Sequence, residues 1–591
     1  MFNLTRSLFG ALVICIAMIF VGCSGSDSGS STANTEDSGK VVQYCSAEPK
    51  VLNPYTRTDA NANILIRRTF QPLVMLDFFS YELVPVLATA LPVTEVQENG
   101  KVHLGMEIRP EAKWDNGGSI TAEDVAFSVK MMKNPFVDNR ALKPYFEYIE
   151  DVVVDESNNR KFTLVCKEPY MLMESALTDL LIIPSYIYDP DGVMKNYAVS
   201  QLENDKEALA DDAVLKKAGD DFNAPKFQRE VVIGSGAYTL DRWETNQRLV
   251  YTLKEDWWGH ALAEENHWFQ AKAPEIIYEV INDQTTAVVA LKGEKIDAMY
   301  RIDPRTFMEE LKKSESFNEK FNTASPTQFL YSYLGMNMRA EKFKDVRTRK
   351  ALRSVMDVKK YGNTVFYGLA ERVNSFIHPS KKQFINPDIP FYDQNLDEAR
   401  RLLAEAGWSD SNGNGTLDMM IEGELTEFNI ELIYPNAAQT SEKGVLMFKE
   451  FAKNVGINVE PRPLDFSVFL DQTKNHNFEM YFGIWGSSPL ESDPKQIWHT
   501  SSYNGGSNYV GFGTPRSDEL IDNLRRELDI EKRSDIYHEL QQIIDEECPY
   551  IFMDATQNRI AISKKFTNTN TSGVNPGFYT PGFTSVNVVA N

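Results

Sequence analysis

Apolar and polar positions alternate with two different periods between residues 428 and 485. Residues 428–435 (FNIELIYP) alternate with a period of two, which is typical of a strand. Residues 441–456 instead place their apolar side chains on one helical face and end at a glycine. The pattern then continues with a strand, a helix and a strand, at residues 457–464, 466–475 and 478–485. The segment therefore predicts a β-α-β-α-β unit with a mostly parallel sheet.

Three further helices follow from caps and apolar spacing. Residues 395–407 (NLDEARRLLAEAG) begin at Asn395 as N-cap and end at Gly407 as C-cap. Two amphipathic helices are predicted near the C-terminus, at residues 516–528 and 532–547. A strand-rich and helix-rich chain of 591 residues is too long for one compact core and predicts two to four domains.

A tryptophan and a run of polar residues stand at the end of the last predicted strand. Trp485 is followed at once by Gly486, Ser487 and Ser488. In sheets of this kind, ligands lie beyond the carboxyl ends of the strands. Trp485 is therefore predicted to be the wall of a ligand pocket, with packing in the core as the alternative.

The N-terminus has the pattern of a secretory signal. Arg6 precedes a run of about fifteen apolar residues, which is short for a membrane span, and Cys23 follows Gly22. FVGC resembles the lipobox of bacterial lipoproteins, so residues 1–22 are predicted to be a signal peptide and Cys23 to carry lipid. The Ser- and Gly-rich residues 23–41 are predicted to be a flexible tether. The alternative is a plain membrane anchor.

Composition narrows the class of partner. A content of 42% hydrophobic and 25% charged residues is typical of a globular protein. The net charge of −23 and the lack of a Lys/Arg-rich block argue against nucleic acid as a partner. Beyond the signal and Cys23, three cysteines remain, Cys45, Cys166 and Cys548, so at most one disulfide is expected.

Catalytic motifs are missing from the sequence. It has no G-x-S-x-G elbow, no P-loop, no H-E-x-x-H and no C-x-x-C. GSGAY, which begins at Gly234, lacks the third glycine of a dinucleotide fingerprint and is interpreted as a turn with close chain approach and positive φ. No enzymatic activity is expected.

One metal motif is present in DSNGNGTLD. Oxygen donors stand at Asp410, Asn412, Asn414 and Asp418, with Gly415 at the sixth loop position, as at the start of an EF-hand calcium loop. The twelfth position holds isoleucine in place of glutamate. A structural Ca²⁺ is one interpretation, and a turn that needs no metal is the other. No other cofactor is expected.

Several stretches together resemble a known family. These are EPKVLNPY from Glu48, the stretch LGMEIRPEAKWDNGGSITAEDVAFSV, IGSGAYTLDRWE, ALKGEKIDAM, FKDVRTRKALRSVMDVKKY, SNYVGFGTPRSDELI and CPYIFM. They resemble the family 5 solute-binding proteins of ABC importers, the class that binds oligopeptides, dipeptides and nickel. Two of these stretches are also explained by structure alone, without contact to a ligand. In the second stretch Thr121 is predicted to cap a helix, and in FKDVRTRKALRSVMDVKKY we expect Arg347 and Arg349 to pair with carboxylates.

The resemblance implies an α/β, periplasmic-binding-protein-like fold with two lobes, a hinge and three domains. Domain II is an insertion, and domain I is discontinuous. The implied boundaries are 42–82, 228–302 and 513–591 for domain I, 83–227 for domain II and 303–512 for domain III.

The resemblance also implies ligand-binding residues. Glu48 falls on a pocket position near the start of domain I, and Asn508 and Phe512 fall on the wall of the second lobe; ordinary hinge or core structure is the alternative for each. Peptide binders of this family have a W-x-x-D pattern whose Asp pairs with the α-ammonium of the ligand. Here the fourth position is Ser488, so the charge is missing; the alternative is that the carboxylate of Glu491 or Asp493, further along the chain, takes its place.

The function implied is capture of a peptide or other small solute and its delivery to the permease of an ABC importer. The chain is expected to be a monomer outside the cytoplasm, in the periplasm or at the cell surface, held to the membrane by lipid. A receptor or chaperone subunit that signals through the same closure is an alternative, and a secreted hydrolase is a minor one. The sequence does not identify the solute.

Overall fold

The computed structural model describes residues 39–139, 142–436 and 439–586. The predicted signal peptide (1–22), the lipidation site Cys23 and almost all of the tether (23–41) lie outside the described residues. Within the described part of the chain, no helix has both the length and the apolar character needed to cross a membrane.

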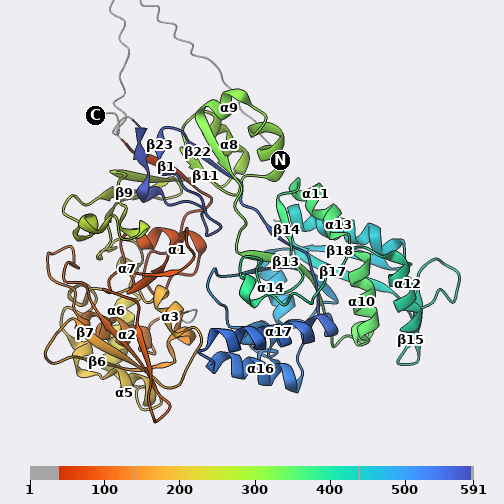
Figure 1. Cartoon of the computed structure of the whole chain (residues 1–591), viewed down its shortest axis with the longest axis horizontal. Helices are drawn as coiled ribbons and strands as arrows, with labels where there is room; N and C mark the ends of the chain where they lie inside the picture. Colours follow the sequence, from red (N-terminus) through yellow and green to blue (C-terminus); the bar gives the residue numbers. More distant parts are fainter. Residues whose placement is uncertain (1–38, 140–141, 437–438, 587–591) are drawn as a thin grey trace, which may run out of the picture. The chain divides into compact units, whose positions relative to one another are not determined.

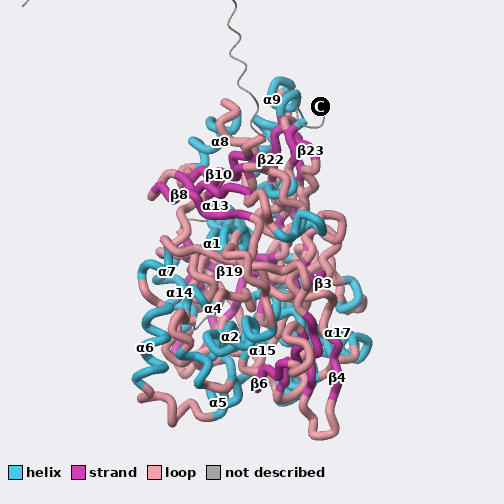
Figure 2. The backbone as a smooth tube through the Cα atoms, turned by 90° about the vertical axis from the view of Figure 1, so that its left-hand side faces the viewer, coloured by secondary structure: helices cyan, strands magenta, loops and turns pink. Residues whose placement is uncertain are grey.

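A seven-stranded sheet joins segments from both ends of the described chain (Figure 1). Its strands, in spatial order, are β12 (Phe321–Ala324), β22 (Ile560–Ser563), β11 (Ala298–Met299), β1 (Val41–Cys45), β10 (Glu275–Val280), β9 (Arg248–Leu253) and β8 (Tyr238–Glu244). Strand β1 runs parallel to both of its neighbours, and the other pairs are antiparallel. Helices α8 (Gln284–Lys292) and α9 (Glu315–Lys320) lie beside β22 in both views (Figures 1 and 2).

A four-stranded antiparallel sheet lies within residues 93–166. Its strands, in spatial order, are β4 (Val93–Val96), β5 (Val102–Glu107), β7 (Lys161–Cys166) and β6 (Ile149–Val154). Helix α2 (Ala122–Lys133) packs against β6 and begins with a capping box, in which the Thr121 N–H donates to Asp124 Oδ2 at 2.9 Å. The predicted cap at Thr121 is therefore confirmed.

The predicted β-α-β-α-β unit is confirmed in a five-stranded sheet. Its elements are β17 (Asn429–Pro435), α13 (Gln439–Lys453), β18 (Asn458–Leu464), α14 (Phe466–Lys474) and β19 (Met480–Gly486). Strand β17 runs parallel to both β18 and β19, as the alternation of strands and helices predicts. Two antiparallel strands complete the sheet, β13 (Leu330–Met336) and β20 (Tyr550–Phe552).

The three other predicted helices are also confirmed, with small shifts at their ends. They are α12 (Leu396–Glu405), α16 (Pro515–Arg526) and α17 (Ile530–Glu547). The Asn395 side chain accepts a hydrogen bond from the N–H of Glu398, as an N-cap does. In α10 (Val346–Val355), Arg347 pairs with Asp345, and Arg349 pairs with Glu547 at 3.1 Å, as predicted.

The remaining elements are short or lie between the sheets. The two-stranded ribbons are β2 (Val74–Leu76) with β3 (Leu83–Pro85), β14 (Ala370–Arg372) with β21 (Asp554–Thr556), β15 (Asp418–Ile421) with β16 (Glu424–Glu427), and β23 (Phe566–Thr567) with β24 (Thr584–Ser585). Further helices are α1 (Ala60–Leu65), α3 (Met173–Ala176), α4 (Ser185–Tyr188), α5 (Val199–Asn204), α6 (Ala213–Phe222), α7 (Pro225–Arg229), α11 (Val358–Phe366) and α15 (Lys495–Trp498). A 3-10 turn, η1 (Ile66–Arg68), follows α1 directly.

Two adjacent segments connect the seven-stranded sheet to the five-stranded sheet. One joins β12 to β13, and the other joins β21 to β22. They pair with each other through a bridge between Thr327 and Gln557, and the Asn558 N–H donates to the Pro326 carbonyl at 2.7 Å. The pair has the form of a hinge, because, among the described residues, only these two segments join the two sheets.

Strand pairing differs from the implied domain boundaries at two places. Residues 303–324 were assigned to domain III, yet β12 pairs with β22 in the seven-stranded sheet. Residues 513–556 were assigned to domain I, yet β20 pairs with β13 and α16 and α17 pack in the core around Tyr333 and Tyr550. Long-range strand pairing decides these memberships, and no local pattern in the sequence reports it.

The three cysteines in the described residues are free and buried. Burial raises the pKa of both Cys45 and Cys166 to about 12, and it also raises the pKa of Cys548. Each of these thiols therefore stays protonated and behaves as a small apolar core residue.

Candidate functional site

Trp485 lies at the carboxyl end of β19, where the sequence predicts a pocket wall. Its indole N–H donates to the Tyr550 hydroxyl at 3.3 Å, and its ring stacks on Tyr509 with centroids 5.9 Å apart. These contacts fix the ring on one side while the rest of it remains partly exposed. Trp485 therefore presents a rigid, flat apolar face.

A cavity of about 720 Å³ opens in front of this ring. One side comes from residues 144–179, and the other comes from residues 485–507 with Arg525. Its polar lining includes the hydroxyl and amide side chains Ser175, Thr178, Ser487, Ser488, Ser492, Gln496 and Ser507. A cavity of this size, with an aromatic wall and a few polar groups, is typical of a small-molecule site.

Ser488 lines this cavity beside Trp485 and brings no charge. Its hydroxyl oxygen accepts a hydrogen bond from the Leu490 N–H at 3.1 Å. The hydroxyl proton stays free to donate to a ligand oxygen. The position suits a carbonyl, an amide or a hydroxyl group better than an ammonium group.

Each carboxylate that lines the cavity already has an arginine partner. Asp493 accepts from Arg525 Nε at 2.7 Å and from the Tyr170 hydroxyl at 3.2 Å. Glu491 accepts two hydrogen bonds from the guanidinium of Arg533, at 2.6 and 3.0 Å.

The third carboxylate, Asp179, forms ion pairs with two arginines through the same oxygen atom. Arg57 lies 3.0 Å from Asp179 Oδ1, and Arg67 lies 2.9 Å from it. The three carboxylates of the cavity are therefore neutralised from within the protein, and none stands free to take the ammonium group of a ligand.

Glu48, Asn508 and Phe512 do not line this cavity. Glu48 pairs with Arg229 at 3.3 Å and accepts a hydrogen bond from the Trp243 indole. The Asn508 side chain is fully buried and bonds to the backbone of Phe512 in both directions, at 2.6 and 3.0 Å. The Asn508 side chain thus holds the loop between residues 508 and 512 in place. A role for Glu48, Asn508 and Phe512 in ligand binding stays a prediction.

Sequence reasoning found one side of the cavity and missed the other. Tyr145 and Tyr170 face Trp485 from a segment more than 300 positions away in the sequence. Burial, followed by the charge of Asp493, raises the pKa of Tyr170, so its phenol stays protonated and donates. No local pattern marks these two tyrosines, because only the tertiary fold brings them to the site.

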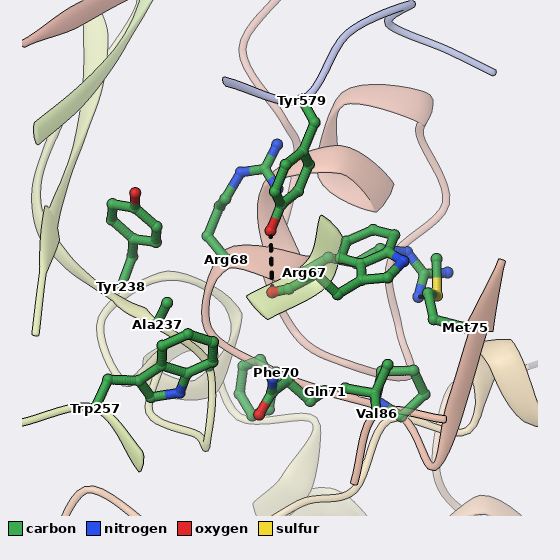
Figure 3. A pocket seen from close by; sticks show the side chains of 13 residues that line it. Arg67, Arg68, Phe70, Gln71, Met75, Val86, Ala237, Tyr238, Trp257 and Tyr579 are labelled. Carbon is green, nitrogen blue, oxygen red and sulfur yellow. Dashed lines mark hydrogen bonds between the residues drawn. The ribbon is translucent and has the colours of Figure 1, made fainter. Parts of the chain in front are cut away.

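A second cavity of about 340 Å³ adjoins the first, and Ser487 lines both. Its wall includes Arg67, Arg68 and Arg301, with Trp268 and Phe329 among its aromatic residues. A small pocket of about 20 Å³ shares Arg67 and Arg68 with this second cavity (Figure 3). These arginines were also missed by sequence reasoning.

The GSGAY glycines fix the chain that carries Arg68. A Cβ atom on Gly236 would lie 2.5 Å from the Arg68 carbonyl oxygen, and one on Gly234 would lie 2.6 Å from that of Thr69. The predicted close approach is thus confirmed. The predicted positive φ is wrong, because neither glycine is among the residues with positive φ, so the missing side chain is needed here for space alone.

The predicted calcium loop folds around Asp410. Asp410 Oδ1 accepts from the N–H groups of Gly413 and Asn414 at 2.8 and 3.0 Å, and its Oδ2 accepts from Gly415 at 3.0 Å. Within the described residues, no group of three or more His, Cys, Asp or Glu side chains is placed to hold a metal ion. Asn412, Asn414 and Asp418 bring one carboxylate besides that of Asp410, and calcium binding here stays a prediction.

The chain is similar to known solute-binding proteins along almost all of its length. The oligopeptide-binding protein AppA of Bacillus subtilis is 25% identical over 571 residues, which cover 94% of this chain and 94% of AppA. The periplasmic oligopeptide-binding protein OppA of Salmonella typhimurium is 22% identical over 557 residues, which cover 93% of this chain and 92% of OppA.

Solved structures show the same fold. The structure of AppA from Bacillus subtilis in complex with a nonapeptide has a TM-score of 0.69 at 22% identity, and the match covers 93% of this chain and 99% of AppA. That of NikA from Brucella suis in complex with Fe(III)-EDTA has a TM-score of 0.72 at 18% identity, covering 92% and 99%. The predicted α/β fold of the periplasmic binding proteins is therefore confirmed.

The family model for "Bacterial extracellular solute-binding proteins, family 5 Middle" matches residues 82–507, well over half of the chain. This chain belongs to family 5 of the bacterial extracellular solute-binding proteins.

Proposed function

We propose that this protein is lipid-anchored outside the cytoplasm, captures a peptide or another small solute by closure of two lobes, and delivers it to the permease of an ABC importer. One observation carries the proposal. The cavity of about 720 Å³ is lined from two segments, residues 144–179 and residues 485–525, that belong to different sheets of the fold. A ligand between such segments is enclosed when they approach each other.

The hinge supports closure as the mode of capture. Only the segments around Thr327 and Gln557 join the seven-stranded and five-stranded sheets in the described chain. A few residues at such crossings absorb the change of backbone angles when lobes move. The lobes themselves stay rigid, because each contains its own buried core.

The chemistry of the cavity limits the cargo. Asp179, Glu491 and Asp493 are each paired with arginine, and Ser488 carries no charge. We infer that the part of the solute beside Trp485 is uncharged, such as a peptide backbone with a blocked amine or a sugar ring. A flat ring or side chain would stack on the indole.

Identification of the natural solute tests the proposal. Native mass spectrometry of the protein purified from its own host is expected to show a bound compound whose mass is that of a short peptide or of a smaller solute. Calorimetry with the identified compound should then show binding that Trp485→Ala weakens by at least tenfold, as loss of a buried aromatic contact predicts. A natural protein with no bound compound, together with no binding to peptide or sugar libraries, would contradict capture as its role.

A further inference from the structure

The second cavity, of about 340 Å³, contrasts in charge with the protein around it. Three arginines line it, Arg67, Arg68 and Arg301, and no Asp or Glu does. The whole chain has a net charge of −23. The positive charge of this cavity therefore differs in sign from the net charge of the whole protein.

Arg68 is buried without a counter-ion. Only 4% of the residue is exposed, and its Nε donates to the Tyr278 hydroxyl at 2.7 Å. Its guanidinium carbon lies 5.3 Å from the centre of the Tyr579 ring (Figure 3). No carboxylate among the described residues pairs with it, and its two Nη atoms have no hydrogen-bond partner there, although both this cavity and the small pocket beside it are lined by Arg68.

Arg301 adds a second cation from the segment that follows β11, beside the hinge residue Asn558. Its side chain is exposed and has no ion pair with any described residue. Its backbone has a φ of +54°, which is uncommon for a residue with a side chain. The Arg301 N–H donates to Asn558 Oδ1 at 2.9 Å, and its carbonyl accepts from the Gln284 amide, so the unusual conformation is held from both sides.

The third arginine is only partly neutralised. Arg67 shares Asp179 with the buried Arg57, so two positive charges meet one negative charge. The cavity therefore faces an excess of positive charge from three sources. Leaving a buried cation without a partner is costly, and that cost is met when a bound ligand supplies the opposite charge.

We propose that Arg68 and Arg301 form a subsite for an oxyanion of the solute, a carboxylate or a phosphate group. This rests on the proposed function, because Ser487 joins the subsite to the cavity beside Trp485. The Nη atoms of Arg68 donate to the anion from the buried side, and Arg301 meets it from the hinge. A planar guanidinium suits either oxyanion, since both accept two parallel hydrogen bonds.

The experiment compares the parent with four variants. Arg68→Met removes the charge and keeps an apolar chain of similar reach, and Arg68→Lys keeps the charge. Arg301→Gln tests the exposed partner. Arg462→Gln is the matched control, because it removes one arginine charge from an exposed pair with Glu431 outside both cavities.

Two readouts are used for each variant. The first is the melting temperature in acetate, phosphate or chloride at one fixed ionic strength, which separates a carboxylate site from a phosphate site. The second is calorimetry with N-acetylated tripeptides as free acids and as amides. In the parent, the acids or the corresponding phosphorylated amides are expected to bind at least about 30-fold more tightly than plain amides, as for a buried charged hydrogen bond.

Arg68→Met is expected to abolish the anion effect in both readouts, Arg301→Gln to weaken it, and Arg68→Lys to keep part of it. The melting temperature of Arg68→Met without anions should equal or exceed that of the parent, because this variant lacks the unpaired buried charge. A subsite is excluded if neither readout depends on Arg68. If no peptide binds while the anion shift still depends on Arg68, the subsite stands and peptide capture fails.

Discussion

Asp554 is a buried acid whose neighbours do not neutralise it. Its residue is 1% exposed, Ser332 donates to its Oδ1 at 2.7 Å, and its Oδ2 has no partner in the described structure. Burial raises the pKa of Asp554 from 3.8 to about 7, and the bond from Ser332 lowers it by less. The carboxyl is therefore protonated in the folded protein at moderately acidic pH.

This shift predicts that the free energy of unfolding falls as the pH rises. The folded state holds the proton up to about pH 7, whereas the unfolded chain releases it near pH 3.8. The stabilisation is thus complete below pH 4 and is lost between pH 4 and about 7. Asp554→Asn should remove this loss and gain up to several kcal/mol over the parent at pH 7, since one pKa unit corresponds to about 1.4 kcal/mol.

Urea unfolding at pH 5 and at pH 7.5 checks the Asp554 prediction. The difference between variant and parent should grow with pH, and Asp397→Asn is the control, because that side chain is 96% exposed. A difference that is the same at both pH values would show that Asp554 is not protonated in the folded protein.

The pairing of the cavity carboxylates predicts that a ligand amine is not needed for binding. Acetylation of the amine of a bound peptide should change its affinity by less than tenfold, whereas breaking a buried ion pair would cost more than a hundredfold. Glu491→Gln should lower stability instead, because the guanidinium of Arg533 loses its negatively charged partner and one of its two hydrogen bonds to residue 491.

Calorimetry with matched free and acetylated peptides measures the effect. Ser488→Asp is the reverse test, because it restores the missing negative charge. This variant should bind the free peptide more tightly than the acetylated one. Tight binding of free peptides that acetylation abolishes would reveal an ammonium site after all.

At the scale of elements, the sequence predicted the strands and helices whose positions depend on local periodicity and on capping residues. The strands and helices from β17 to β19 lie close to their predicted positions, because each has its own periodicity and caps. The memberships of β12 and β20 were not predictable, since each pairs with a strand more than 200 positions away. Trp485 was found because a strand end marks it, whereas Tyr170 and Arg68 have no such mark.

The loop before β15 remains a candidate for weak calcium binding. Two carboxylates and no glutamate at the twelfth position predict a dissociation constant of about 10⁻⁴–10⁻³ M. Millimolar Ca²⁺ should then raise the melting temperature relative to EGTA, because the ion binds the folded state alone. Asp410→Ala should abolish the shift, and a parent without any shift would leave the loop a turn held by its own hydrogen bonds.

At the scale of the whole molecule, family membership decides between binding and catalysis. The prediction that the chain is not an enzyme is confirmed, because its relatives are solute-binding proteins. The proposed delivery of solute to a membrane permease would be favoured by a position near the membrane, which is the physical reason for the predicted anchor at Cys23.

The anchor prediction is tested by Cys23→Ser. Several acyl chains hold a protein firmly at a membrane, whereas a single chain holds it only marginally. The variant is expected to leave the membrane fraction or to keep its unprocessed N-terminus, which changes its mobility on a gel. Cys548→Ser is the control, since that cysteine is buried in the folded body. A Cys23→Ser protein that fractionates and migrates like the parent would refute lipidation.

Hydrogen bonds, an ion pair and a cation–π contact of Arg525 with the Tyr170 ring cross from the segment around Tyr170 to the region around α16. The Tyr170 hydroxyl donates to Asp493 at 3.2 Å, the Met171 N–H donates to the Arg525 carbonyl at 2.8 Å, and Arg526 pairs with Glu168 at 3.3 Å. These contacts join segments on the two sides of the cavity. They therefore stabilise the arrangement of these two segments that the structure shows, even without a ligand.

Tyr170→Phe should shift the protein toward an open form. A hydrogen bond to a charged group contributes about 1.5–3 kcal/mol, so the ratio of closed to open molecules should fall by at least about tenfold, and ligand affinity should fall with it. Small-angle X-ray scattering should show a larger radius of gyration without ligand and the parent value with it. Tyr392→Phe, which loses a bond to Asp545 away from the cavity, should scatter like the parent. If Tyr170→Phe also scatters like the parent and binds as tightly, the backbone contact of Met171 and the ligand itself hold the lobes together.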